Sequence, residues 1–208
     1  MFDEAELPAL KKLLLLHEWG QRTLLTKLGI IHEDLESTSG SSPIESIRSR
    51  VKTPESIAAK LYRLGLEPTA ANAKAHLRDI AGVRVICPFS RDIFYLVDLL
   101  KGMQDAAIVA EKDYVSNPKP GGYRSYHVIM EIPVFRSGLT EKVPVELQLR
   151  TEAMNFWATL EHKARYKYKE HVPAHLSAEL VTCADKIAEL DRRMFLIHDI
   201  IALINQEG

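Results

Sequence analysis

Hydrophobic positions recur at helical spacing near both ends of the chain. Residues 4–36 carry apolar side chains every three to four positions and predict a long first helix. Residues 174–206 predict a long last helix, in which one repeat with steps of four and three is apolar throughout: Leu176, Leu180, Cys183, Ile187, Leu190, Met194, Ile197, Ile201 and Ile204. So strict a repeat is typical of the seam of a coiled coil or helix bundle.

The seam of the last helix has two interpretations. It packs on the first helix of the same chain, which is apolar enough to serve as a partner, or it packs on other copies of the chain. Towards the C-terminus the stripe widens, because Phe195, Leu196, Ile200 and Leu203 join it. One antiparallel neighbour would not cover that width, and soluble proteins rarely leave such patches bare. We therefore expect a homo-oligomer with the terminal helices in its interfaces.

Between the terminal helices the pattern changes to short apolar runs. It predicts strands at 79–87, 106–111, 125–134 and 142–150. Helices are predicted from the Thr53-Pro54 start signal onward and at 70–77, 91–101 and 152–167. This order of elements predicts an α+β fold, with a mixed β-sheet of four to five strands, packed helices, and long N- and C-terminal helices.

The last predicted strand has one unusual face. Val145, Leu147 and Leu149 alternate with a carboxylate, an amide and a guanidinium, those of Glu146, Gln148 and Arg150. Because strand side chains alternate between faces, the three polar groups stand in a row on one side of the sheet. The row is typical of a binding surface.

A glycine- and proline-rich loop precedes these strands, within residues 112–127. Pro118, Pro120, Gly121 and Gly122 break regular structure and allow close backbone approach. Tyr123 follows at once, and its cationic or ionisable neighbours are Lys112, Lys119, Arg124 and His127. An aromatic ring beside cations suits a nucleotide, whose base stacks on the ring. The alternative is a polar hairpin loop with a tyrosine in the core.

Basic residues gather where residues 48–63 enter a helix. Arg50 and Lys52 lie just before its N-terminus, while Ser56, Lys60 and Arg63 share one helical face. The helix dipole already favours anions at this end, so the segment suits a polyphosphate. The alternative is a solvated basic face.

Two carboxylates are predicted at strand positions, Asp79 and Glu146. Two carboxylates near phosphates indicate Mg²⁺, which completes its coordination with phosphate oxygens and water. That combination is typical of phosphoryl or nucleotidyl transfer. Alternatively, Asp79 pairs with Arg78 or Arg84, and Glu146 forms a cross-strand ion pair.

The composition of the chain excludes several classes of protein. The 208 residues are 46% apolar and carry a formal net charge of −1, which argues against a broad polyanion-binding surface. Two cysteines are too few for a disulfide framework, and no zinc-site spacing occurs. Without a signal peptide or an 18-residue apolar run, we expect a cytoplasmic protein that makes no contact with a membrane.

Six motifs in order resemble those of the small alarmone synthetases, the synthetase-only relatives of the stringent-response Rel enzymes. The resemblance covers nearly the whole chain and is highly specific. The motifs are S-P-I-E (42–45), S-R-V-K-T-P-E-S-I (49–57), R-D-I-A-G-V-R-V-I-C (78–87), K-D-Y-V-S-N-P-K-P-G-G-Y-R-S-Y-H (112–127), V-E-L-Q-L-R-T (145–151) and M-N-F-W-A-T-L-E-H-K (154–163).

The resemblance implies a nucleotidyltransferase-like fold and a defined reaction. The β,γ-diphosphate of ATP passes to the 3′-hydroxyl of GDP or GTP, giving AMP and ppGpp or pppGpp. It also implies one synthetase domain over 1–208, with an N-terminal helix (1–40), a catalytic core (44–170) and an oligomerisation helix (174–206). The implied oligomer is a tetramer.

The same resemblance implies roles for individual residues. Asp79 is similar to a Mg²⁺ ligand, and Glu146 to a second carboxylate that either binds metal or acts as the base for the 3′-hydroxyl. Tyr123 resembles the tyrosine that stacks on guanine. The implied ATP-binding residues are Arg50, Lys52, Ser56, Lys60 and Arg84. The implied residues for GDP or GTP are Lys112, Lys119, Tyr123, His127, Gln148, Arg150 and Asn155.

A second functional hypothesis is a catalytically silent regulator of the same fold that binds nucleotides or RNA. The presence of both Asp79 and Glu146 favours the enzyme. Single-stranded RNA is a conceivable ligand, but a net charge near zero does not indicate it.

Overall fold

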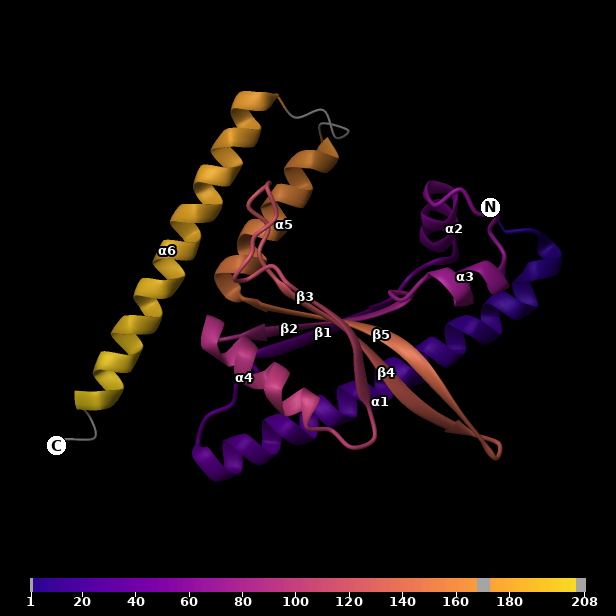
Figure 1. Ribbon diagram of the computed structural model, residues 1–208, viewed down its shortest axis with the longest axis horizontal. Helices are drawn as coiled ribbons and strands as arrows, with labels where there is room; N and C mark the ends of the chain where they lie inside the picture. Colours follow the sequence, from indigo (N-terminus) through magenta and orange to yellow (C-terminus); the bar gives the residue numbers. More distant parts are fainter. Residues whose placement is uncertain (1, 168–172, 205–208) are drawn as a thin grey trace.

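The computed structural model describes residues 2–167 and 173–204 of the chain (Figure 1). After a 3₁₀ turn at Glu4–Glu6, the helices are α1 (Leu7–Ser39), α2 (Pro54–Arg63), α3 (Ala70–His76), α4 (Ser90–Lys101), α5 (Glu152–Lys167) and α6 (Ala174–Ile204). The strands are β1 (Ser46–Val51), β2 (Ala81–Cys87), β3 (Ala107–Asp113), β4 (Tyr126–Arg136) and β5 (Leu139–Thr151).

The five strands form one mixed sheet in the order β1-β2-β5-β4-β3. Only β2 and β5 run parallel, and the other neighbours are antiparallel. The predicted mixed sheet and the four predicted strands are confirmed, with small shifts at their ends. The strand predicted at 79–87 begins at Ala81, so Asp79 lies just before it. The sequence analysis did not assign β1, which is the fifth strand.

Helices α1 and α4 cover one face of the sheet and bury the main core between them. Leu24 and Leu28 of α1 and Leu96 of α4 are fully buried there against Val85 and Leu147 of the sheet. The apolar set of each alternating strand faces this core, as the period of two requires. The polar set therefore points to the opposite face, which these two helices leave open.

The remaining helices flank the two ends of the sheet (Figure 1). Helices α2 and α3 pack with the first half of α1 in a second cluster that includes Leu10, Ile57 and Ile80. Helices α5 and α6 lie side by side at the other end, joined through Trp157, Ala158 and Ala184. Within the described residues, the structure contains no helix that combines the length and apolarity needed to cross a membrane.

In the part of the chain that the structure describes, helix α6 packs on α5 and not on α1, so the interpretation that its seam packs on the first helix is wrong. The helix lies against α5 and touches the start of α4, where the rings of Phe195 and Phe89 are 5.5 Å apart. The predicted helix end at 206 falls outside the described residues.

Candidate active site

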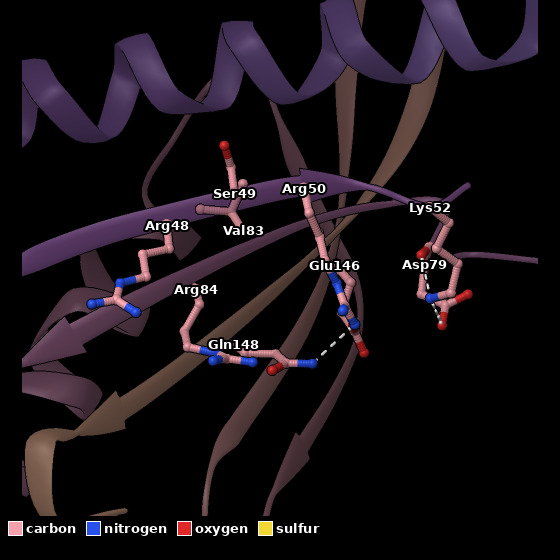
Figure 2. A pocket seen from close by; sticks show the side chains of 10 residues that line it. Arg48, Ser49, Arg50, Lys52, Asp79, Val83, Arg84, Glu146 and Gln148 are labelled. Carbon is pink, nitrogen blue, oxygen red and sulfur yellow. Dashed lines mark hydrogen bonds and ion pairs between the residues drawn. The ribbon is translucent and has the colours of Figure 1, made fainter. Parts of the chain in front are cut away.

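One row of polar side chains crosses all five strands on the open face. Strand register places Arg48, Arg84, Gln148, His127 and Lys112 opposite one another in that order. Directly opposite residues carry their side chains on the same face of a sheet. Figure 2 shows Arg48, Arg84 and Gln148 pointing away from α1. The predicted polar row of β5 is therefore the middle of a longer one.

A second row lies beside the first and runs from Arg50 through Gly82 to Glu146. Gly82 has no side chain, so the floor between the guanidinium and the carboxylate stays open. The second row lines a pocket of about 170 Å³ with Lys52 and Asp79, and the first row contributes Arg48, Arg84 and Gln148 to it (Figure 2).

Asp79 is held at the edge of this pocket by two lysines. Its Oδ2 accepts hydrogen bonds from Lys52 Nζ at 2.7 Å and from Lys60 Nζ at 2.5 Å. Burial raises the pKa of Asp79, but the two lysines outweigh this effect and lower it. The predicted alternative, a pair with Arg78 or Arg84, is wrong, because the partners come from β1's end and from α2.

Glu146 stands between hydrogen-bond donors of its own sheet. Gln148 Nε2 donates to its Oε2 at 3.0 Å, and His127 Nδ1 lies 3.4 Å from its Oε1. Burial raises the pKa of Glu146, but His127 and the hydrogen bond from Gln148 together lower it below its ordinary value, and the charge of Asp79 works against that lowering. The carboxylates of Asp79 and Glu146 are therefore close enough to repel each other electrostatically. His127 comes from β4, so the expected cross-strand partner exists.

Arginines give the pocket an excess of positive charge. Burial lowers the pKa of Arg84, and the charges of Arg150, Arg50 and Arg48 lower it further, because like charges crowd together. Arg84 donates to Asn155 Oδ1 of α5 at 3.4 Å, while its buried Nε has no partner within the described residues. A polyanion would relieve this repulsion and satisfy the free donor.

The loop between β3 and β4 (residues 114–125, the Tyr123 loop) lies at the far end of the same face. The Tyr123 hydroxyl contacts Arg150 Nη2 at 2.6 Å and His127 Nε2 at 2.7 Å. Lys119 Nζ and Arg150 Cζ lie 5.0 and 5.1 Å from the centre of the tyrosine ring. The predicted group of Tyr123, Lys119, His127 and Arg150 is therefore a real cluster, and it adjoins Glu146 through His127.

Most of the predicted site residues lie on this face of the sheet, and Ser56 does not. Lys112 is exposed at the β3 end of the first row. Ser56 is exposed in the first turn of α2, where its hydroxyl contacts the capping hydroxyl of Thr53 at 3.1 Å. It does not line the pocket, so its described contacts are those of a helix cap.

The sequence analysis did not include Arg48 among the site residues. In the structure it lines the pocket and stands opposite Arg84. A signal was available, because Arg48, Arg50 and Lys52 alternate at the period of a strand. Only Ile47 and Val51 mark the apolar face of that strand, which is too few for the apolar pattern to predict it.

The acidic residues fit a hard cation that brings most of its own ligands. Among the described residues, no cluster of three His, Cys, Asp or Glu side chains is arranged to hold a metal. Asp79 Oδ1 is buried and has no hydrogen-bond partner within the described chain. A free carboxylate oxygen beside a second carboxylate suits Mg²⁺, which binds one or two protein carboxylates and takes water and phosphate oxygens besides.

Residues 49–171 match the model of a region found in RelA and SpoT proteins, which covers more than half of the chain. The chain belongs to this family. A GTP pyrophosphokinase of Bacillus subtilis, YwaC, is 46% identical over 184 residues, which are 88% of each protein. The family resemblance predicted from the six motifs is thereby confirmed.

Solved structures of RelA/SpoT family members share the fold. The small alarmone synthetase 2 of Bacillus subtilis superposes with a TM-score of 0.83 at 44% identity, over 91% of this chain and 97% of that one. The small alarmone synthetase 1 of the same organism, solved with its product pppGpp, also gives 0.83 at 33% identity, over 92% and 97%. The predicted fold class is confirmed.

Proposed function

We propose that this protein is a GTP pyrophosphokinase, which transfers the β,γ-diphosphate of ATP to the 3′-hydroxyl of GDP or GTP. The products are AMP and ppGpp or pppGpp. The observation that carries the proposal is the pocket itself: two carboxylates, one with a free buried oxygen, lie beside a crowded group of arginines. Charge of both signs at this spacing suits a metal-bound triphosphate.

Asp79 and Glu146 hold Mg²⁺ in this proposal. The bound cation would offset negative charge on the ATP phosphates. Lys52 and Lys60 form ion pairs with Asp79 and balance its charge. A cation on Asp79 would compete with these ion pairs, and the ammonium groups of Lys52 and Lys60 would then be free to bind phosphate oxygens.

Arg50 and Arg84 complete the ATP side, with Arg48 beside them. A guanidinium stays charged when it is buried among like charges, and it binds phosphate oxygens in a forked geometry. Arg50 lies at the pocket edge, where its plane can also cover the adenine ring. We assign Ser56 a role in ordering the start of α2, next to Lys60.

The Tyr123 loop takes the acceptor nucleotide. Tyr123 stacks on the guanine base, and Lys119 and Lys112 bind the phosphates of GDP or GTP. The remaining residues on the acceptor side are Gln148, Arg150, His127 and Asn155. The 3′-hydroxyl oxygen attacks the β-phosphorus of ATP and its proton passes to solvent water. The bond from that phosphorus to the α,β-bridging oxygen breaks, and AMP leaves with that oxygen. The lowered pKa of Glu146 suits a metal ligand better than a base, because an efficient base has a pKa near the working pH.

The reaction is tested by incubating the protein with ATP, GDP and Mg²⁺ and separating the nucleotides by chromatography. We expect AMP and ppGpp to accumulate in equal amounts, and excess EDTA to stop both. AMP without ppGpp would indicate a hydrolase and would contradict the proposal. Unchanged product formation in EDTA would contradict the metal assignment alone.

Replacing Tyr123 with alanine is expected to weaken GDP binding by about 1–3 kcal/mol, the usual contribution of a base stacked on an aromatic ring. ATP binding should change much less. Calorimetry on each nucleotide measures both effects. Tyr123→Phe keeps the ring and removes the hydroxyl contacts to Arg150 and His127, so it separates stacking from hydrogen bonding.

A matched control is Tyr95→Ala, which removes the same atoms from an exposed site on α4. It should leave both affinities unchanged. If Tyr123→Ala weakens ATP and GDP equally, the tyrosine has a structural role and the stacking assignment is wrong.

We further propose a homo-oligomer, a tetramer, with α6 in its interfaces. The seam of α6 is used within the chain only in its first part, where Leu180 and Ile187 pack on the Trp157 cluster. From Leu190 onward the described side chains of the seam are exposed, by 59% at Leu190 and 64% at Ile204. A single-domain enzyme with such a stripe needs a partner to cover it.

A further inference from the structure

Helix α6 approaches the Tyr123 loop from behind at one point. Gly122 has a φ of +88° and is buried. A Cβ placed on it would lie 2.6 Å from the Cβ of Ala184, closer than real side chains come, and 3.5 Å from the Cα of Val181. The Trp157 ring on α5 would be 3.4 Å away. Glycine is therefore needed here for close packing as well as for the backbone angle.

Few other contacts hold the Tyr123 loop against α6. A cavity of about 240 Å³ lies beside it, between the loop, α5 and α6, and both Gly122 and Ala184 line its wall. Apart from apolar packing, an ion pair of Arg124 with Asp185 at 3.5 Å joins the Tyr123 loop to α6 in the described part of the chain, and the Asp185 side chain is 67% exposed. Such exposed pairs contribute little. The backbone contact at Ala184 is thus the firm one.

The loop transmits that contact to Tyr123 as one unit. The Gly122 N–H donates to the Lys119 carbonyl at 2.8 Å, and the Lys119 N–H donates to the Tyr123 carbonyl at 3.1 Å. These two bonds close a tight turn over residues 119–123. The Tyr123 ring also packs on the cluster that contains Ala184. A shift at Gly122 therefore moves the ring that faces the open site.

Ala184 is itself fixed by α5. Trp157 Nε1 donates to the Leu180 carbonyl of α6 at 2.9 Å, and the Trp157 side chain is 5% exposed. This hydrogen bond fixes the position of α6 relative to the Tyr123 loop. We propose that Ala184 is a positioning residue for the acceptor site: α6 is the back wall that sets the Tyr123 ring at the height where a guanine base stacks.

This inference rests on the proposed role of Tyr123 in binding the acceptor, and it adds a role for a helix outside the catalytic pocket. It predicts an effect on one substrate and not on the other. Changes at the contact should alter the KM for GDP or GTP, because the loop serves the acceptor, and should spare the KM for ATP.

A double-mutant cycle tests the contact. Gly122→Ala is expected to raise the KM for GDP at least about tenfold, which equals about 1.4 kcal/mol, with the KM for ATP changed less than about twofold. Part of this loss comes from the positive φ and part from the Ala184 methyl. Adding Ala184→Gly removes only the second part, so the double variant should recover most of the affinity for GDP.

The control places the new glycine elsewhere on α6. Ala178 is exposed on the same helix and touches neither the loop nor Trp157 in the described contacts. Gly122→Ala combined with Ala178→Gly should keep the full defect, although the helix carries the same glycine penalty. Equal recovery in both double variants, or recovery in neither, would overturn the inference.

Fluorescence gives a readout that does not depend on turnover. In a Trp19→Phe background, Trp157 is the remaining tryptophan and lies against Gly122. We expect GDP to change its emission in the parent, with a midpoint that rises in Gly122→Ala and falls back when Ala184→Gly is added. Tyr123→Ala in the same background separates the two ideas. If it leaves GDP binding intact, the acceptor role of the loop fails; if it weakens GDP binding while the cycle shows no coupling, only the role of Ala184 fails.

Discussion

Asp79→Asn is expected to reduce turnover at least about a hundredfold, the lower range for losing a group that acts directly on the reacting atoms. The asparagine keeps the shape and loses the negative charge. Lys52 and Lys60 then face each other without the carboxylate that both now contact. The cation loses a charged ligand, and the pocket gains net positive charge.

Glu146→Gln is expected to have an effect of the same size, and the dependence of its rate on Mg²⁺ distinguishes a metal ligand from a general base. If both carboxylates hold the cation, each variant should need a higher Mg²⁺ concentration for half-maximal rate. A general base would instead leave that concentration unchanged and reduce the rate at every concentration. Initial rates over a Mg²⁺ series decide between the two roles.

The pH dependence gives a second criterion for Glu146. Its pKa is lowered in the folded protein, so the group stays ionised from neutral pH down past its ordinary range. We therefore expect no acidic limb from Glu146 in the rate profile between about pH 6 and 8. Thermal unfolding should accompany each variant, because a protein that is no longer folded says nothing of the role. A folded Asp79→Asn or Glu146→Gln protein with near-normal turnover would contradict its assignment.

The alternation in β5 was enough to predict the centre of the site from sequence. Apolar side chains at 145, 147 and 149 have one destination, the core, so the polar set must face the other way. The same reasoning failed for β1. An edge strand has only one neighbour, and Ser49 stands where an inward apolar residue would have completed the pattern. The strand is marked by its cations instead.

Partners that come from distant segments could not be predicted in this way. Asp79 contacts Lys52 and Lys60 because β1 ends beside the start of β2, and α2 lies next to both. The order of elements along the chain does not determine this arrangement. Arg78 and Arg84 were nearer in sequence and were the natural alternatives. The meeting of Gly122 with Ala184 was equally hidden, since it joins residues from a loop and a late helix.

The double substitution Ile197→Asp and Ile201→Asp is expected to reduce the solution mass from near four times the 23.5 kDa chain towards smaller species. Both side chains are exposed in the single chain, by 50% and 53%, so the folded protomer tolerates the change. In an interface they would become buried carboxylates without partners. Each such group costs several kcal/mol, which exceeds what a helical seam can absorb.

The matched control is Ala178→Asp with Thr182→Asp. The two positions have the same spacing of four, lie on the same helix, are exposed, and stand outside the apolar seam. Light scattering should give the wild-type mass for this control and a lower mass for the seam variant, with equal helix content by circular dichroism. Because α6 also forms the wall behind Gly122, loss of the oligomer should raise the KM for GDP more than the KM for ATP. A wild type that is monomeric, or a seam variant that keeps the wild-type mass, would contradict the assignment of α6 to the interface.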